Sequence, residues 1–199
     1  MGAIMLNKNL VLTLISSITF LSYMSSSEAS FDPGYSNKVN SVSWREFTQA
    51  KQRKYAANHT LEKAPLPKSI SSGDVIKVDL GKLAWGAYDS NGKLIRWGDA
   101  SGGKNFCDDI GKGCKTVTGT FTFYKKSGSG CKSNLFPVGK GGAPMPYCMH
   151  FSGGYALHGG FTPDFNASHG CVRVPVSEAQ WMNQNFVKVG KTKIEISYK

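Results

Sequence analysis

The pattern of apolar and polar residues predicts that β-strands make up most of the chain after residue 70. Runs with apolar residues at every second position, or with continuous apolar residues between turn signals, are typical of half-buried and buried strands. Asn91-Gly92 is a strong hairpin signal between two of these runs. The predicted strands cover 75–80, 83–89, 93–99, 116–124, 149–152, 155–158, 172–174 and the alternating positions Ile194, Ile196 and Tyr198.

Two helices are predicted near the ends of this β-rich region. Each begins with a capping box, in which a serine and a Glu or Gln three residues later satisfy backbone amides at the helix start. The boxes are Ser43 with Glu46 and Ser177 with Gln180, and the apolar stripes are Trp44, Phe47 and Tyr55 in the first helix and Ala179, Met182 and Phe186 in the second. The segment Pro65-Leu66-Pro67 is expected to end the first helix, and Gly190 the second. The predicted fold class is mainly β with two helices, in a single domain.

Residues 1–29 have the features of a secretory signal peptide. Lys8 provides a positive start, residues 10–23 are apolar, and Ser27-Glu28-Ala29 places small residues where a signal peptidase cleaves. An uncleaved N-terminal anchor is the alternative, although the apolar run is short for a membrane span. We therefore expect an exported protein of the periplasm or cell envelope, or a secreted one, with no stable membrane insertion after cleavage. The rest divides into an N-terminal extension with a helix, 30–70, and the β-rich body, 71–199.

The positive charge narrows the class of partner. The formal net charge is +11, and removal of Lys8 and Glu28 with the signal segment leaves it unchanged. Such an excess favours anionic surroundings such as wall polymers, outer-leaflet lipids or nucleic acid. The basic residues are scattered apart from Lys51, Arg53 and Lys54, and the sequence contains no nucleic-acid-binding motif. Because export is expected, the predicted partner is the cell envelope and not nucleic acid.

The number of cysteines predicts one free thiol. Five cysteines follow the signal segment, and an oxidising compartment pairs cysteines, so an odd number leaves one unpaired. Four of them lie between residues 107 and 148, whereas Cys171 follows a Ser-His-Gly sequence. Among the three pairings that four cysteines allow, we favour Cys107–Cys114 and Cys131–Cys148, because each closes a local loop. Cys171 is then the thiol left for chemistry.

Two histidines near Cys171 suggest how this thiol could be activated. A thiol is a good nucleophile only as a thiolate, and a nearby imidazole promotes that form. His158 and His169 lie within 13 residues of Cys171. Gly170 lets the backbone turn sharply before the cysteine, so that backbone amides can point at a developing oxyanion. The residues alone therefore provide a nucleophile, a candidate base and an oxyanion loop.

The sequence Ser-His-Gly-Cys-Val-Arg at 168–173, preceded by His158-Gly159, resembles the catalytic motif of L,D-transpeptidases of the YkuD type. The resemblance extends over 72–199, which makes the 71–199 body a catalytic domain of this kind. The block at 141–148 is similar to envelope members of the family, including enhanced-entry proteins. The resemblance implies a β-rich fold with the cysteine on a loop beside the sheet, and neither a cofactor nor a metal.

The implied reaction is acyl transfer on peptidoglycan peptide stems. The thiolate attacks the L-centre carbonyl of diaminopimelate in a tetrapeptide stem, D-Ala leaves, and a thioester forms. An amine of another stem, or of an anchored envelope protein, then accepts the acyl group. Water as the acceptor would make the enzyme an L,D-carboxypeptidase instead.

The same resemblance assigns roles to individual residues. It implies that Cys171 is the nucleophile and His158 the base, with the Gly159 carbonyl holding the other ring nitrogen of His158. His169 and Gly170 shape the oxyanion loop together with the amide of Cys171. His169 is expected to serve this loop rather than to move protons.

Three further residues are candidates for substrate binding. Ser168 and Arg173 match family positions that support the loop and the substrate, and Tyr155 is a candidate for lining a groove. Core packing is the alternative for Tyr155, and a structural ion pair is the alternative for Arg173. Only nine residues separate His158 from Ser168, fewer than in most family members, so the intervening loop and the choice of acceptor are expected to differ.

Three other functions compete with acyl transfer. A zinc site could be built from Cys148, His150, His158, His169 and Cys171, although this spacing matches no standard zinc pattern. A papain-like or NlpC/P60-like peptidase is disfavoured because the cysteine precedes its histidine in those enzymes. A wall-binding or host-interaction module with a vestigial site is the third alternative, and the complete set of His158, His169 and Cys171 argues against it.

Overall fold

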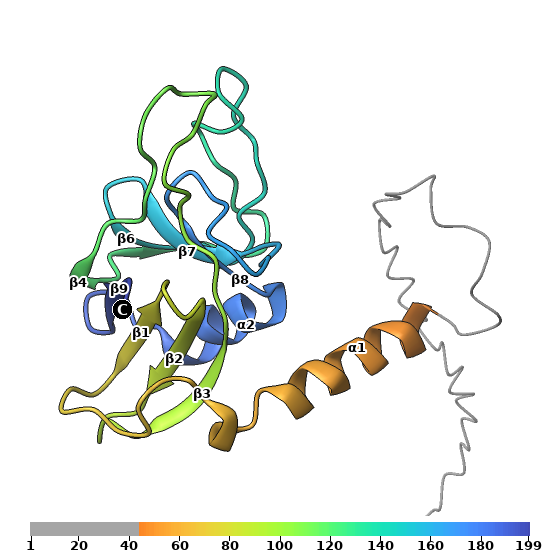
Figure 1. Cartoon of the computed structure of the whole chain (residues 1–199), viewed down its shortest axis with the longest axis vertical. Coiled ribbons are helices and arrows are strands. Elements are labelled where there is room, and N and C mark those ends of the chain that lie inside the picture. The colour runs from red at the N-terminus through yellow and green to blue at the C-terminus, as the bar shows by residue number, and fades with distance from the viewer. Residues whose placement is uncertain (1–43) are drawn as a thin grey trace, which may run out of the picture. The chain divides into compact units, whose positions relative to one another are not determined.

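The computed structural model describes residues 44–199, which form two β-sheets and two α-helices (Figure 1). The larger sheet has the order β3-β2-β1-β9-β4, and the smaller sheet has the order β5-β6-β7-β8. The prediction of a mainly β single domain with two helices is confirmed. The strands are β1 (Val75–Asp79), β2 (Ala84–Tyr88), β3 (Leu94–Asp99), β4 (Gly119–Thr122), β5 (Lys125–Lys126), β6 (Met149–Ser152), β7 (Tyr155–Gly159), β8 (Val172–Val174) and β9 (Lys193–Ser197).

The first helix, α1 (Trp44–Asn58), ends well before the predicted proline stop. The ring Nδ1 of His59 donates to the carbonyl of Tyr55 at 2.8 Å, and the short 3-10 helix η1 (Leu61–Lys63) follows. His59 also pairs with Asp99 of β3 at 3.0 Å, so the C-terminal end of α1 is attached to the edge of the larger sheet. The predicted signal segment, the cap residue Ser43 and the side chains of Trp44 and Phe47 lie outside the described residues.

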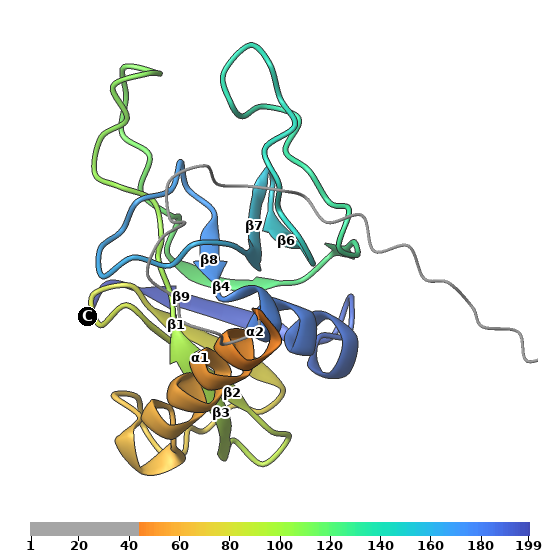
Figure 2. The ribbon, with the colours of Figure 1, turned by 90° about the vertical axis from the view of Figure 1, so that its right-hand side faces the viewer.

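Each sheet contains one parallel strand pair, and a shared core joins the two sheets. β1 pairs with β2 in an antiparallel hairpin and with β9 in parallel, and β7 pairs with β8 in parallel. Buried apolar side chains from both sheets and the second helix form one core, which includes Ile76, Trp85, Phe123, Leu157 and Met182. Figure 2 shows the smaller sheet beside the larger one, with long loops projecting beyond it. None of the helices in the described residues is long and apolar enough to cross a membrane.

The predicted strand 116–124 is shorter in the structure and pairs only over β4. Thr116 uses its polar groups elsewhere, because its amide donates to the Tyr198 hydroxyl at 3.1 Å and its own hydroxyl accepts from the amide of Gly103 at 2.9 Å. Tyr198 itself lies just beyond β9, although it was predicted to be part of the last strand. These bonds attach the segment before β4 to the loop that follows β3.

The second helix, α2 (Val176–Trp181), begins two residues earlier than predicted and lacks the predicted serine cap. Pro175 occupies the cap position, and its fixed backbone angle suits the start of a helix without a side-chain cap. The chain continues as the π-helix η2 (Met182–Phe186). The carboxylate of Glu178 accepts two hydrogen bonds from Arg96 at 2.7 and 2.9 Å, which anchors α2 to β3.

Candidate active site

The motif cysteine lies at the end of a loop that joins β7 to β8. In the parallel pairing Leu157 lies opposite Val172 and His158 opposite Arg173, so Cys171 comes directly before the paired part of β8. Paired residues of neighbouring strands project to the same face of a sheet. The side chains of Cys171, His158 and Arg173 therefore start from one face of the smaller sheet.

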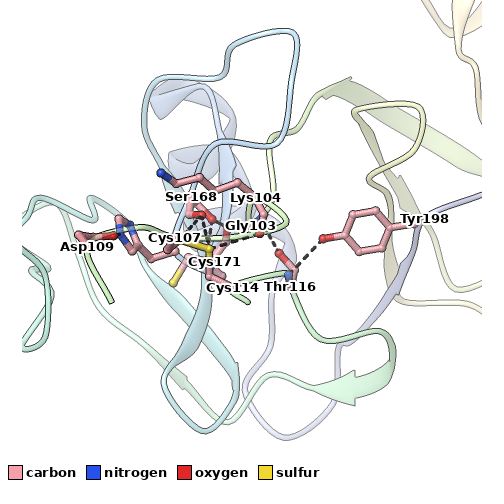
Figure 3. Close-up of a disulfide and its surroundings, with 11 residues drawn as sticks. Gly103, Lys104, Cys107, Asp109, Cys114, Thr116, Ser168, Cys171 and Tyr198 are labelled. Carbon is pink, nitrogen blue, oxygen red and sulfur yellow. Dashed lines mark hydrogen bonds and ion pairs between the residues drawn. A yellow bond between two sulfur atoms is a disulfide. The ribbon is translucent and has the colours of Figure 1, made fainter. Parts of the chain in front are cut away.

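The segment after β3 holds this loop by its backbone. The amide of Ser168 donates to the carbonyl of Gly102 at 2.8 Å, and the amide of Lys104 donates to the carbonyl of Ser168 at 3.0 Å. Ser101 exchanges two backbone bonds with Arg173, at 2.8 and 2.9 Å. Figure 3 shows Gly103 and Lys104 alongside Ser168, with Cys171 close by. The end of the loop before Cys171 is thus held by backbone pairing.

Ser168 and Gly170 shape the turn before Cys171. The hydroxyl of Ser168 donates to the carbonyl of Cys171 at 2.6 Å and accepts from the amide of Gly170 at 3.0 Å. Gly170 has a φ of +126°, and a Cβ at this position would lie 2.7 Å from Cε1 of Tyr155. Glycine is therefore required here. The Gly170 amide already donates to Ser168, so this amide is not free for an oxyanion.

Cys171 is the free cysteine of the chain, as predicted. The other four form the favoured disulfides Cys107–Cys114 and Cys131–Cys148, which confirms the predicted pairing. The Cys171 thiol contacts the carbonyl oxygen of Gly154 at 3.9 Å, and its side chain packs against the small apolar cluster around Met145, Cys148 and Ala156. Burial raises the pKa of the Cys171 thiol above its ordinary value of 9.0.

His158 is buried in β7 and held in one tautomer. Its Nδ1 donates to the carbonyl of Gly159 at 2.8 Å, as the family resemblance implied. A carbonyl can only accept, so Nδ1 carries the proton and Nε2 is the basic nitrogen. Burial lowers the pKa of His158 to about 4, and the positive charge of Arg173 acts in the same direction. The imidazole is consequently neutral at neutral pH.

The thiol and the imidazole do not form an ion pair in this structure. Among residues 44–199, no hydrogen bond joins Cys171 to His158, and the two pKa shifts favour a neutral thiol and a neutral imidazole. This differs from the sequence-based expectation that the imidazole promotes the thiolate. The physical reason is desolvation, which penalises both charged forms. Catalytic hydrogen bonds often form only when a substrate closes the site.

Arg173 places a positive charge next to both groups. Its side chain packs against Gly160, where a Cβ would lie 3.2 Å from its Cδ, and its Nε is buried without a hydrogen-bond partner. No ion pair with a carboxylate is found for it within the described part of the chain. Burial lowers the pKa of the Arg173 guanidinium below its ordinary value, while the neighbouring Cys171 opposes this shift. An uncommitted guanidinium at this position suits a carboxylate ligand.

His169 is contacted by residues of two long loops. Its Nε2 lies 2.8 and 2.9 Å from the two carboxylate oxygens of Asp109, and its ring lies against that of Phe136 with centroids 4.4 Å apart. Asp109 and Phe136 were not among the predicted site residues, because both are distant from the motif in the chain. The only local signal was an acidic pair, Asp108-Asp109, inside a disulfide loop of a basic protein.

The comparisons with known proteins identify the family. The family profile of the L,D-transpeptidase catalytic domain, YkuD, matches residues 73–196. This chain belongs to that family. No curated protein sequence matches it. The match to the solved L,D-transpeptidase of Xylanimonas cellulosilytica has 31% identity and a TM-score of 0.57, and it covers 67% of this chain and 64% of that one.

Two further solved structures share the fold of this L,D-transpeptidase domain. The L,D-transpeptidase of Stackebrandtia nassauensis has 20% identity and a TM-score of 0.53, with 68% of this chain and 62% of that one covered. The LD transpeptidase LdtMt1 in complex with imipenem has 20% identity and a TM-score of 0.50, with 61% and 57% covered. The chain therefore spans less than two thirds of the length of each of these structures.

The geometry and the family match also decide between the alternatives. Because the chain belongs to the YkuD family, the alternative of a papain-like or NlpC/P60-like peptidase is rejected. Cys148 cannot serve in the alternative zinc site, because its sulfur is bonded to that of Cys131. Ligand atoms of Cys107, Asp109 and His169 lie within 4.8 Å of one another, but the Cys107 sulfur is likewise bonded to Cys114 and cannot act as a thiolate ligand. Tyr155 packs against the core and against Gly170, so it supports the loop.

Proposed function

We propose that this protein is an exported cysteine L,D-transpeptidase that acts on the peptide stems of peptidoglycan. The donor is a tetrapeptide stem, which loses D-Ala as Cys171 becomes acylated at the L-centre carbonyl of diaminopimelate. The acyl group then passes to an amine of another stem or of an anchored envelope protein. Family membership supports the reaction class.

The observation that carries this proposal is the arrangement of Cys171, His158 and Gly159. One free thiol ends a tightly held loop, and a buried imidazole on the same sheet face has its Nδ1 bound to a carbonyl, which leaves Nε2 as the base. This is the order of nucleophile, base and orienting acceptor that cysteine acyltransferases require. A vestigial binding module would have no need to keep all three.

Because Cys171 and His158 are both neutral at rest, the first chemical step must move the thiol proton to the imidazole. As the donor carbonyl reaches Cys171, the sulfur forms the C–S bond while Nε2 of His158 takes the thiol proton. The imidazolium returns this proton to the departing amine of D-Ala, and a thioester remains. In the second half the acceptor amine attacks the thioester, His158 takes a proton from that amine, and the proton returns to the sulfur as the C–S bond breaks.

Arg173 is proposed to contribute to donor binding. Its guanidinium lacks an acidic partner among the described residues and lies beside both Cys171 and His158. Stem peptides carry carboxylates, which pair with guanidinium groups through strong charge-assisted bonds. Ser168 is proposed to support the loop and not to bind substrate, because its hydroxyl is already used twice in the turn.

Export is part of the proposal and rests on the cysteines. Two disulfides leave one free thiol, and such bonds form and persist in oxidising compartments such as the periplasm or the outside of the cell. The signal-like segment 1–29 and the net charge of +11 agree with a location near anionic wall polymers. Cell fractionation of the tagged protein tests this, and retention in the cytoplasm would contradict it.

The deciding experiment is mass spectrometry of purified muropeptides incubated with the protein. Cross-linked dimers together with released D-Ala support transpeptidation, whereas tripeptides without dimers would show that water is the acceptor. Cys171→Ala should abolish both products while circular dichroism stays unchanged. Absence of any product from the wild-type protein would favour the binding-module alternative.

β-Lactams provide a test that does not depend on the acceptor. One structural neighbour was solved in complex with imipenem, and the strained carbonyl of such a drug mimics the donor amide. We expect imipenem to add one drug mass to the wild-type protein and none to Cys171→Ala. An unmodified wild-type protein under excess drug would count against a donor pocket of the family type.

A further inference from the structure

We propose that Asp109 is a positioning residue that acts through His169 and holds the nucleophile loop in its reactive shape. The two carboxylate oxygens of Asp109 lie 2.9 and 2.8 Å from Nε2 of His169. Hydrogen bonds to an ionised carboxylate are stronger than those between neutral groups. The inference rests on the proposed function, because the loop concerned is the one that ends in Cys171.

Asp109 is presented to His169 by a loop that cannot move independently of the nucleophile loop. The Cys107–Cys114 disulfide closes it, and the amide of Cys107 donates to the carbonyl of Lys112 at 3.0 Å. Both sulfurs are buried and approach the carbonyl oxygen of Ser168 to 3.9 and 3.7 Å. Figure 3 shows this disulfide lying between Asp109 and Thr116, with Ser168 and Cys171 beside it.

The close packing under this loop leaves little room for adjustment. A Cβ on Gly103 would lie 1.8 Å from the carbonyl oxygen of Cys114 and 2.9 Å from Cα of Gly170. Three segments therefore contact one another through their backbones: the loop closed by Cys107–Cys114, the segment after β3 that contains Gly103, and the turn at Gly170. The hydrogen bond between the side chains of Asp109 and His169 then fixes the position of the disulfide loop relative to the turn before Cys171.

The His169 ring also contacts an aromatic side chain. Phe136, from the loop closed by Cys131–Cys148, lies against it with a centroid separation of 4.4 Å and an interplanar angle of 33°. The imidazole is therefore held by a carboxylate from one disulfide loop and by an aromatic ring from the other. Its hydrogen bond also lowers the pKa of the Asp109 carboxyl, so this group is ionised at neutral pH. His169 links three loops at a point adjacent to Gly170.

The expected consequence is a selective effect on carbonyl chemistry. Acylation needs the loop backbone aligned with the developing oxyanion, whereas alkylation of a thiol by iodoacetamide has no such requirement. Loss of the Asp109 carboxylate should slow acylation of Cys171 by about tenfold, the size expected for one charge-assisted hydrogen bond. The alkylation rate should stay within about twofold of the wild type, since the thiol environment is unchanged.

The experiment compares Asp109→Ala, Asp109→Asn and Asp108→Ala in the full-length protein. Asp108 is the exposed neighbour in the same loop with the same charge, so it is the matched control. Rates of acylation by imipenem and of alkylation by iodoacetamide are followed by intact-protein mass. Asp109→Asn keeps an acceptor oxygen and should show an intermediate acylation rate. Equal acylation rates in Asp109→Ala and Asp108→Ala would overturn the proposal, and so would a parallel loss of alkylation.

A second measurement keeps this test separate from the proposed function. Amide hydrogen exchange of the peptide covering 166–172 should be faster in Asp109→Ala than in Asp108→Ala, whether or not the protein turns over any stem. If the wild-type protein is not acylated but this exchange difference is present, the proposed function fails and the positioning role stands. If the exchange rates are equal, the positioning role fails.

Discussion

The burial of His158 makes the stability of the folded protein depend on pH in a defined window. Burial lowers the pKa of this imidazole to about 4, whereas an unfolded chain has the ordinary histidine value near 6.5. Between these two values the unfolded chain binds a proton that the folded protein does not. The free energy of unfolding must therefore fall as the pH decreases from about 6.5 to about 4.

The size of the effect follows from the two pKa values. A gap of about 2.5 corresponds to about 3 kcal/mol, because each pKa unit is worth about 1.4 kcal/mol. The side chain is only 7% exposed, so screening by solvent does not reduce this value greatly. A loss of about 3 kcal/mol is a large part of the typical 5–15 kcal/mol of a folded domain. In a domain of this size it would lower the melting temperature by about 10 °C.

The assay is urea unfolding of the wild-type protein and of His158→Gln at several pH values between 4 and 8. Other groups titrate in the same window, but they are common to both proteins and cancel in the difference. The wild-type advantage over His158→Gln should be largest above about pH 6.5 and should shrink by about 3 kcal/mol toward pH 4. A difference that does not change with pH would refute the buried neutral histidine. A difference that grows toward low pH would show that His158 is charged in the folded protein.

Three further predictions concern the nucleophile loop and its support. Gly170→Ala should lower the free energy of unfolding by about 2 kcal/mol and reduce turnover, because the added Cβ would meet Tyr155 at 2.7 Å, while Gly128→Ala, which points into open space, should be neutral in thermal unfolding. Glu178→Ala should lower the free energy of unfolding by about 2 kcal/mol, because it removes both hydrogen bonds that the partly exposed Arg96 makes to α2. Arg96→Ala in the Glu178→Ala background should cost less than Arg96→Ala alone, which a double-mutant cycle measures. Iodoacetamide should label one thiol in the unreduced protein, at Cys171. The labelling rate should continue to rise above pH 9, because the pKa of this thiol is raised. Labelling at a second cysteine, or a rate that reaches a plateau below pH 8, would contradict the structure.

Local features of the fold could be predicted from the sequence because their cause is local. The two-residue alternation located most strands, and the turn at Asn91-Gly92 joins β2 to β3 with Gly92 at a φ of +75°. The odd number of cysteines identified Cys171 as the free thiol. The start of α2 was mispredicted, because Ser177 resembled a cap while Pro175, two residues earlier, occupies that position.

Features that depend on distant partners were not visible in the sequence. The parallel pairing of β1 with β9 joins residues more than 100 positions apart, and no local pattern specifies such a partner. The contact between Asp109 and His169 is likewise not specified by any local pattern, since 60 positions separate the two residues. The motif predicted which residues take part in the chemistry, but the charge state of those residues depends on burial. Desolvation is a property of the assembled core and not of the order of residues.

The neutral state of Cys171 also explains how a free thiol persists next to a disulfide. Thiolates, not thiols, attack disulfides and most oxidants. The Cys171 side chain packs against the cluster that contains Cys148, whose disulfide partner Cys131 lies against the same cluster. A preformed thiolate there would exchange with this disulfide and lose the nucleophile. Because burial raises the pKa of Cys171 and lowers that of His158, little thiolate is present at neutral pH in the resting protein. The same desolvation that slows the resting thiol would thus protect it in the oxidising compartment that we propose for this protein.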